Sequence, residues 1–264
     1  MLLRDQVAVI TGAGRGIGRA HALLLAREGA RVVVNDLGVE RDGSGTARHA
    51  ADEVVAEIRA AGGQAVASHD SVTTREGVDQ MMWTALNAFG RLDVLVNNAG
   101  ILRDRTLIKM TEAEWDSVIE VHLRGTFLTT QAAARIMKLQ GHGGRIVNTA
   151  SVSGLLGNFG QGNYGAAKMG VVGLTLTAAK ELLRRIASEY AAEDPDVLGE
   201  PEVWGVEALA ASSVVIRLVV KTTPSEQWRV SRELRERIKV GFDAAGIEIP
   251  FPQQTVWARS PEQP

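Results

Sequence analysis

The chain has 264 residues, of which 45% are hydrophobic and 23% are charged, and its formal net charge is −2. These values are typical of a globular protein. A net charge of −2 gives no excess of positive charge that would attract nucleic acids or anionic membranes. The absence of cysteine excludes disulfides, thiolate metal sites and a cysteine nucleophile, and no metal site is expected. The start of the chain lacks a signal-peptide pattern, and no apolar run approaches the roughly 20 residues that span a bilayer, so we expect a cytoplasmic protein.

Strand-like and helix-like segments alternate from residue 6 to about residue 190. The expected strands are Gln6–Thr11, Arg31–Asp36, Gln64–His69, Leu92–Asn97 and Arg145–Thr149. The expected helices are Ile17–Glu28, Asp52–Ala61, Arg75–Phe89, Glu112–Leu139 and Tyr164–Tyr190. Because the strands are apolar on both faces, we expect a parallel sheet with helices on each side. The alternation predicts an α/β fold of the doubly wound, Rossmann-like kind.

The alternation stops after residue 190. The elements expected there are a loop, two antiparallel strands, an amphipathic helix and a last strand-like piece: Glu193–Pro201, Val203–Leu209, Ser213–Thr222, Ser225–Ala245 and Ile247–Pro250. On the amphipathic helix, Trp228, Leu234 and Ile238 are expected in the core.

A glycine-rich turn joins the first strand to the first helix. Gly12, Gly16 and Gly18 would let the backbone approach a pyrophosphate, which the helix N-terminus favours with unpaired N–H groups and its dipole. Asp36 ends the second strand, where a carboxylate can bind both ribose hydroxyls and would repel a 2′-phosphate. This favours NAD over NADP, and Arg15 alone argues the other way. A turn that is purely structural and a solvated Asp36 are the alternatives.

Tyr164 and Lys168 are four residues apart in an expected helix, so their side chains project from one face. A free tyrosine is a poor base at neutral pH, but a neighbouring ammonium favours the phenolate. Such a pair can exchange a proton with a substrate while hydride moves at a nicotinamide ring. Ser151, at the end of the fifth strand, supplies a hydroxyl that can hold the substrate oxygen. Spacing alone indicates a secondary alcohol or ketone as substrate.

Three motifs in order resemble the short-chain dehydrogenase/reductase family: T-G-x-x-x-G-x-G from Thr11, N-N-A-G from Asn97, and the set Ser151, Tyr164 and Lys168. The resemblance implies that Asp70 binds the adenine amino group and that the N-N-A-G segment lines the cofactor cleft. With the turn, the implied cofactor-binding residues are Gly12, Arg15, Gly16, Ile17, Gly18, Asp36, Asp70, Asn98 and Lys168. NAD is the expected cofactor.

His122 occupies a slot where this family usually has an asparagine that supports the proton relay. A relay role and a buried structural role are equally open for it. This position, together with Asn35–Gly38, Ile101–Arg105 and Gly157–Gln161, resembles the dehydrogenase part of the peroxisomal multifunctional enzymes type 2. That resemblance extends from Val7 to about Ala178. It implies oxidation of a (3R)-hydroxyacyl-CoA with NAD by a catalytic set of Ser151, Tyr164, Lys168 and His122.

A second resemblance begins near residue 180. Three stretches are similar to the C-terminal cytoplasmic domain of small-conductance mechanosensitive channels: Pro201–Glu207, Ser212–Arg217 and Gly246–Gln253. No membrane helix accompanies them, so channel activity is not expected. The sixth strand, nicotinamide loop and substrate lid that a short-chain dehydrogenase should have are not recognisable.

We therefore expect a chimera joined within Tyr164–Tyr190, with a dehydrogenase part (1–178), a ferredoxin-like fragment (179–258) and a tail (259–264). In this hypothesis the fragment shares one sheet with the dehydrogenase part, and its strand Ser213–Thr222 lies parallel to the fifth strand. An engineered chimera that binds NAD with weak or no turnover is the first reading, an active oxidoreductase the second, and a natural fusion the third. The expected partners are a dinucleotide and a small-molecule or acyl-CoA substrate, and the protein is a monomer or a homodimer.

Overall fold

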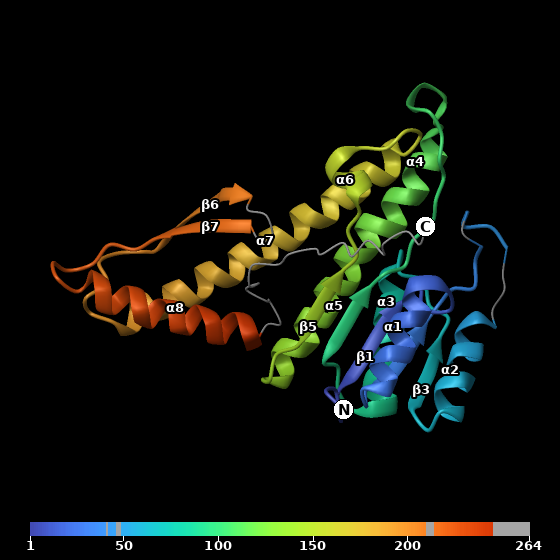
Figure 1. The fold of residues 1–264 in the computed structure, drawn as a ribbon, viewed down its shortest axis with the longest axis horizontal. Coiled ribbons are helices and arrows are strands. Elements are labelled where there is room, and N and C mark those ends of the chain that lie inside the picture. Colours follow the sequence, from blue (N-terminus) through green and yellow to red (C-terminus); the bar gives the residue numbers. More distant parts are fainter. Residues whose placement is uncertain (41, 46–48, 210–213, 245–264) are drawn as a thin grey trace, which may run out of the picture. The chain divides into compact units, whose positions relative to one another are not determined.

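The computed structural model describes residues 1–40, 42–45, 49–209 and 214–244 (Figure 1). The chain divides into two compact units, 1–176 and 177–264, with the boundary inside one long helix. The expected strand-like piece Ile247–Pro250 lies outside the described residues. None of the described helices is both long enough and apolar enough to cross a membrane.

The first unit is built on a parallel sheet with the strand order β3-β2-β1-β4-β5. Its strands are β1 (Val7–Thr11), β2 (Arg31–Asn35), β3 (Gln64–Ser68), β4 (Val94–Asn97) and β5 (Arg145–Asn148). Val9 at the centre pairs with Val33 on one side and with Leu95 on the other. This order confirms the doubly wound, Rossmann-like class that the alternation of elements predicts.

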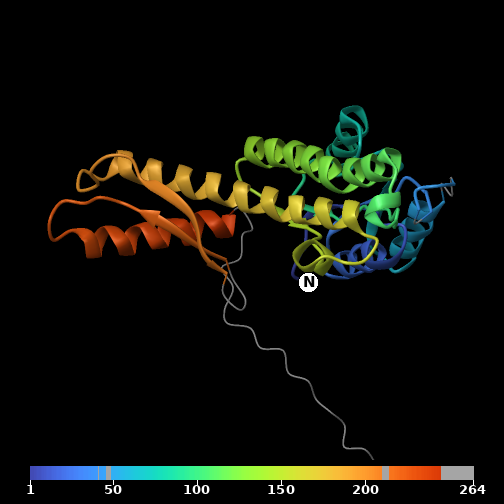
Figure 2. The same ribbon diagram turned by 90° about the horizontal axis from the view of Figure 1, so that it is seen from above.

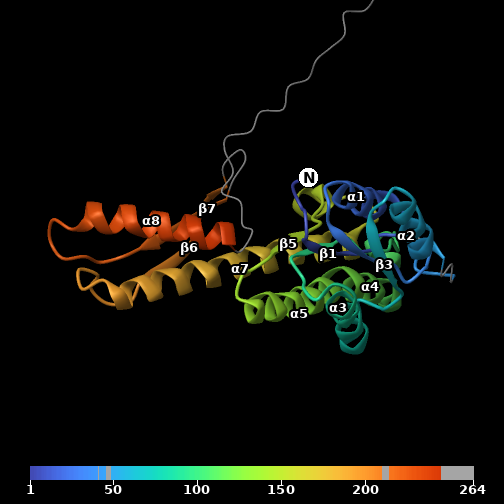
Figure 3. The ribbon, with the colours of Figure 1, turned by 90° about the horizontal axis from the view of Figure 1, so that it is seen from below.

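Helices cover both faces of this sheet. They are α1 (Gly16–Arg27), α2 (Ala50–Ala60), α3 (Arg75–Phe89), α4 (Glu112–Ile119), α5 (Gly125–Gln140), α6 (Val152–Leu156) and α7 (Gly162–Glu193). Figure 3 shows α1 and α2 on one side of the strands, and α3 and α5 on the other. The alternation of side chains along β1 supplies both cores, because Val7 and Val9 pack with α3 and α5 whereas Ala8 and Ile10 pack with α1 and α2.

Three details of this unit differ from the sequence prediction. The expected helix Glu112–Leu139 is interrupted by one π-helical turn, η2 (Glu120–Arg124). The helix α6 and a short 3₁₀ turn, η1 (Leu107–Lys109), are not predicted. The strand β5 is not covered on both faces, since Val147 is 49% exposed.

The second unit consists of the hairpin β6 (Glu202–Leu209) and β7 (Val214–Val219), the helix α8 (Gln227–Ala244) and the C-terminal part of α7. Figure 2 shows α8 alongside this part of α7. The strands β6 and β7 pair antiparallel with each other, as predicted, but in a separate two-stranded sheet. The expected pairing of Ser213–Thr222 with the fifth strand is therefore wrong for the described residues.

The reason is that the second unit buries its strands against its own helices. Leu183 and Ile186 of α7, Phe242 of α8 and Leu218 of β7 form one apolar cluster. A second cluster surrounds Tyr190, whose side chain is fully buried. Since these contacts already satisfy the apolar face of the hairpin, it needs no partner strand to gain a core.

A polar network closes the open end of this core. The Tyr190 hydroxyl lies 2.6 Å from Asp194 Oδ2 and 3.0 Å from Glu233 Oε2. The guanidinium of Arg229 contacts both oxygens of Asp194 and holds its pKa well below the usual range. On α8, the buried Leu234 agrees with the prediction and Ile238 packs against the core, but Trp228 is 71% exposed and does not belong to it.

Candidate functional site

The glycine turn after β1 is tightly packed on its inner side. A Cβ at Gly18 would lie 2.2 Å from the carbonyl oxygen of Gly12 and 2.5 Å from Asn98 Nδ2. Gly12 and Gly16 both have positive φ, +62° and +53°, a backbone conformation that other residues adopt at a cost. These positions therefore need glycine for the turn to form.

The outer side of the turn is open. The first helical residues, Gly16 and Ile17, are exposed, and no side chain caps the N-terminus of α1, whose N-cap residue is Arg15. A Cβ at Gly16 would meet no atom within 4 Å. The unpaired N–H groups of this helix end thus face open space, which is the environment that a phosphate requires.

Asp36 follows β2 and lies directly against the turn. Its Oδ2 accepts a hydrogen bond from Gly14 N at 2.8 Å, and its Oδ1 accepts one from Gly38 N at 2.8 Å. The guanidinium of Arg15 is 3.0 Å from Glu40 Oε1 and 3.1 Å from Oε2. Glu40 raises the pKa of Arg15 and pairs with its charge. Arg15 is the residue that, by its charge, could favour the 2′-phosphate of NADP.

Asn98 fixes the turn from the neighbouring strand β4. Its Nδ2 donates to the carbonyl oxygens of Thr11 and Gly12, both at 3.1 Å, and its backbone N–H donates to Thr11 Oγ1 at 3.0 Å. Asp70 follows β3, where its Oδ2 accepts a hydrogen bond from Ser68 Oγ at 2.8 Å. The structure thus brings the predicted glycines, Asp36 and Asn98 together at the carboxyl ends of the strands, while Asp70 lies at the end of the next strand.

Tyr164 and Lys168 lie on successive turns near the start of α7. Lys168 Nζ is 5.7 Å from the centre of the Tyr164 ring and donates a hydrogen bond to the carbonyl oxygen of Thr149 at 2.6 Å. Lys168 is only 4% exposed, and this burial lowers the pKa of its ammonium to about 8. At neutral pH Lys168 therefore carries a proton that it can release in a slightly basic solution.

Ser151 lies two residues beyond Thr149 and is the N-cap of α6. Its Oγ accepts a hydrogen bond from Ser153 N at 3.2 Å. The segment packs on the start of α7, because a Cβ at Gly154 would lie 3.1 Å from Lys168 Cβ. Within the described residues the Ser151 hydroxyl makes no hydrogen bond with Tyr164, although both border the same end of α7.

His122 lies in the π-helical turn η2 and contacts Tyr164. Its ring meets the Tyr164 ring edge-on, with centroids 5.1 Å apart and planes at 89°. Its Nε2 is 2.8 Å from the carbonyl oxygen of Ile101 and 3.1 Å from Ile101 N. Burial and, to a lesser extent, the nearby ammonium of Lys168 lower the pKa of His122 to about 4.

The lowered pKa of His122 makes folding sensitive to acid. When the pH falls below 6.5, the unfolded chain takes up a proton on this ring before the folded chain does. The free energy of unfolding should then fall by about 1.4 kcal/mol per pH unit from this residue, down to pH 4. Urea titrations at pH 6.5 and 5.0 should show a difference of about 2 kcal/mol that His122→Asn loses. Equal pH dependence in both proteins would contradict this assignment.

Three residues that contribute to this geometry are not found by sequence reasoning. Glu40 binds Arg15, Thr149 accepts from Lys168, and Gly100 leaves room for the His122 ring. Gly100 could have been found, since it ends the N-N-A-G motif. Glu40 and Thr149 carry no local signal, because their partners are distant along the chain.

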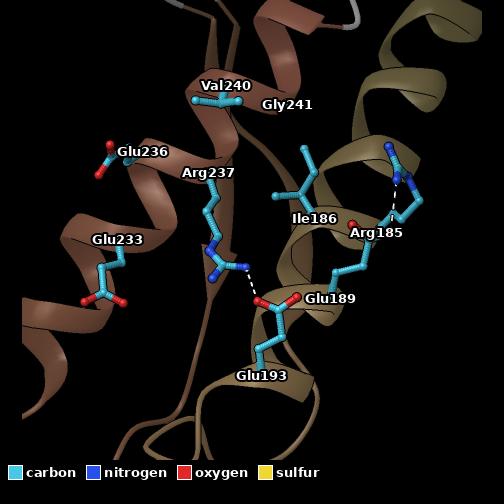
Figure 4. A pocket seen from close by; sticks show the side chains of 9 residues that line it. All are labelled: Arg185, Ile186, Glu189, Glu193, Glu233, Glu236, Arg237, Val240 and Gly241. Atoms are coloured by element: carbon cyan, nitrogen blue, oxygen red, sulfur yellow. Dashed lines mark hydrogen bonds and ion pairs between the residues drawn. The ribbon is translucent and has the colours of Figure 1, made fainter. Parts of the chain in front are cut away.

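A separate groove lies between α7 and α8 in the second unit (Figure 4). Its volume is about 600 Å³, and glutamates and arginines line most of it. Arg237 binds Glu193 at 2.5 Å, and Arg185 binds Glu189 at 3.0 Å. These ion pairs join the two helices or lie along one of them. The sequence predicts no catalytic or binding role for any residue of this groove.

The strand order and the glycine turn after β1 define the first unit as a dinucleotide-binding domain. A family model described as short chain dehydrogenase matches residues 6–188. The chain therefore belongs to the short-chain dehydrogenase family, whose cofactor is a nicotinamide dinucleotide. A second model, the C-terminal domain of the mechanosensitive ion channel MscS, matches residues 171–249 and overlaps the first within α7.

Known relatives match the dehydrogenase part. The peroxisomal multifunctional enzyme type 2 of Drosophila melanogaster is 57% identical over 176 residues, which are 67% of this chain and 29% of that protein. The 3-oxoacyl-[acyl-carrier-protein] reductase of Synechocystis is 50% identical over 69% of this chain and 70% of that protein. A crystal structure of a short chain dehydrogenase from Mycobacterium avium superposes with a TM-score of 0.64 at 50% identity, covering 69% of this chain and 66% of that one. The chain thus spans less than a third of the length of the fly enzyme.

Proposed function

We propose that this chain is a chimera that binds NAD in its first unit and catalyses slow oxidation of a 3-hydroxyacyl thioester. The observation that carries the proposal is the uncapped N-terminus of α1, which faces open space beside Asp36. The N–H groups of Gly16, Ile17 and Gly18 would bind the diphosphate. The Asp36 carboxylate would bind the ribose hydroxyls, and the pairing of Arg15 with Glu40 supports NAD rather than NADP.

The proposed catalytic residues are Ser151, Tyr164 and Lys168. Bound NAD supplies the hydride acceptor. Tyr164 takes the hydroxyl proton of the substrate, and the Lys168 ammonium lies 5.7 Å from the centre of its ring. Ser151 donates a hydrogen bond to the substrate oxygen. Lys168 is anchored to Thr149, so its charge is held in place during the proton transfer.

Exposed apolar side chains on the segments next to this centre support an acyl chain as part of the substrate. The segments before α4 and before α7 are joined by a hydrogen bond from Arg105 N to the Gly160 carbonyl oxygen at 2.8 Å. The exposed apolar side chains on and beside these segments are Leu107, Ile108, Leu155, Leu156 and Phe159. Two relatives are named for acyl chemistry, namely the Synechocystis 3-oxoacyl reductase and the multifunctional enzyme. A (3R)-hydroxyacyl-CoA is therefore the substrate to test first.

Slow turnover is expected because the family match ends at residue 188 and a channel-type segment follows. Hydride transfer needs the nicotinamide ring in near-attack geometry, and a poorly held ring costs orders of magnitude in rate. An engineered origin explains this junction of two families within one helix. A fully active dehydrogenase is the second candidate, favoured by the direct contacts of Tyr164 with Lys168 and His122.

Thermal unfolding with and without NAD tests the cofactor site. A ligand that binds only the folded state stabilises it by about 2.7 kcal/mol at 100 times its dissociation constant. NADH absorbance with a 3-hydroxyacyl-CoA then distinguishes slow turnover from the full rate of a native relative. No change in melting temperature at millimolar NAD would overturn the proposal.

Replacing Glu40 by glutamine tests how NAD is selected over NADP. The change releases Arg15, which can then approach a 2′-phosphate. Because both side chains are more than half exposed, the gain in NADP affinity should be at most about fivefold, with NAD affinity unchanged. Titration calorimetry measures both. The matched control is Glu57→Gln, which releases Arg19 from a similar surface pair and should change neither affinity.

A further inference from the structure

The His122 side chain is fixed by burial and by the Ile101 backbone, although a proton relay needs a nitrogen that can exchange protons. Its side chain is buried, and its Nε2 faces both backbone groups of Ile101. If Nε2 carries the proton it donates to the carbonyl oxygen, and if it does not it accepts from the N–H. In either tautomer Nδ1 is buried without a hydrogen-bond partner among the described residues. Among the described residues neither ring nitrogen makes a hydrogen bond with the Tyr164 hydroxyl, and the two rings meet in a T-shaped contact.

The backbone on both sides is shaped to hold this ring. A Cβ at Gly100 would lie 2.3 Å from His122 Cε1, so the imidazole packs directly on the glycine backbone. His122 lies within the π-helical turn η2, and Thr126 Oγ1, in the next turn, donates to the His122 carbonyl oxygen at 2.7 Å. Such π-helical turns are rare and are frequently found at functional sites.

The charges around His122 keep it neutral. The groups that face it are Tyr164 and Lys168 on α7 and the backbone of Ile101. Burial opposes protonation, and the ammonium of Lys168 opposes it further. At pH 7 the ring is neutral, and its Nε2 is hydrogen-bonded to the Ile101 backbone. Such a ring neither gives nor receives a proton at this pH.

We propose that His122 is a positioning residue, which holds the Tyr164 ring edge-on and ties the Gly100–Ile101 segment to η2, rather than a carrier of protons. The expected effect of His122 on turnover rests on the proposed function, whereas its effect on the position of the Tyr164 ring does not. The positioning role explains why the last residue of the N-N-A-G motif must be glycine here: any side chain would displace the imidazole and, through it, the tyrosine.

Two substitutions at His122 distinguish positioning from relay. His122→Phe keeps a ring against Tyr164, whereas His122→Ala removes it. If His122 positions Tyr164, the alanine variant should lose on the order of 10- to 100-fold in kcat, and the phenylalanine variant should recover most of that loss. KM and the pH dependence of kcat should stay unchanged, and added imidazole should not restore the alanine variant. Equal loss in both variants with rescue by imidazole would overturn the inference.

A readout that needs no turnover completes the test. The chain has two tyrosines, so ¹³C-labelled tyrosine gives two sets of ring signals. The Tyr164 set should shift in His122→Ala, which removes the imidazole, and in Gly100→Ala, which displaces it, while the Tyr190 set should not move. Unchanged Tyr164 signals in both folded variants would refute the positioning role. If the wild-type chain shows no turnover but these signals shift, the proposed function fails and the inference holds.

Discussion

Replacement of Gly18 by alanine should weaken NAD binding by about 10- to 100-fold, because overpacking of a close contact costs about 1–3 kcal/mol. The added methyl group would lie 2.2 Å from the Gly12 carbonyl oxygen and 2.5 Å from Asn98 Nδ2. Neither can move without changing the turn whose N–H groups would bind the diphosphate. Titration calorimetry with NAD measures the effect.

The control for Gly18 is a helical glycine without close neighbours. Gly173 in α7 has open space where its Cβ would be, so Gly173→Ala should leave NAD affinity unchanged and should not destabilise the helix. Circular dichroism would confirm that both variants are folded. Wild-type NAD affinity in folded Gly18→Ala would contradict the assignment of this turn to the cofactor.

Tyr164→Phe should abolish turnover while it leaves NAD binding intact. The phenylalanine keeps the ring that packs against His122 and Lys168 but removes the oxygen that we propose as the acceptor of the substrate proton. Loss of a general base costs about 10²- to 10⁴-fold, which would bring an already slow rate to background. NADH absorbance with a 3-hydroxyacyl-CoA measures the rate, and the NAD-induced rise in melting temperature measures binding.

A second variant tests the charge of Lys168 separately from the ring of Tyr164. Lys168→Met preserves much of the buried volume but removes the ammonium beside the Tyr164 ring and its hydrogen bond to Thr149. It should lower the rate about as strongly as Tyr164→Phe, and more strongly at pH 7 than at pH 9, because the pKa of about 8 means that wild-type Lys168 has itself lost most of its charge at pH 9. If Tyr164→Phe retains the wild-type rate, the proton acceptor is another group and the proposed centre is wrong.

Much of the first unit could be predicted because its signals are local. The strands are short β-branched runs, and the observed β1, Val7–Thr11, is within one residue of the predicted Gln6–Thr11. The glycine turn has to follow β1, since Gly12 and Gly16 adopt backbone conformations that glycine favours. Spacing of four residues is enough to place Tyr164 and Lys168 on one face of a helix. The π-helical turn η2 escapes this kind of reasoning, because one extra residue in a helical turn leaves the hydrophobic pattern nearly unchanged.

By itself, the sequence determined the class of the first unit, its family and the position of its glycine turn, because each depends on neighbours within one or two turns of chain. Only the tertiary structure decided that β6 and β7 form a sheet of their own, that Glu40 neutralises Arg15, and that the His122 ring meets Tyr164. These outcomes depend on which distant surfaces are buried together. The partner of a strand depends on which pairing buries its apolar face best. Because the possible partners are distant along the chain, a local sequence pattern does not show which one is favoured.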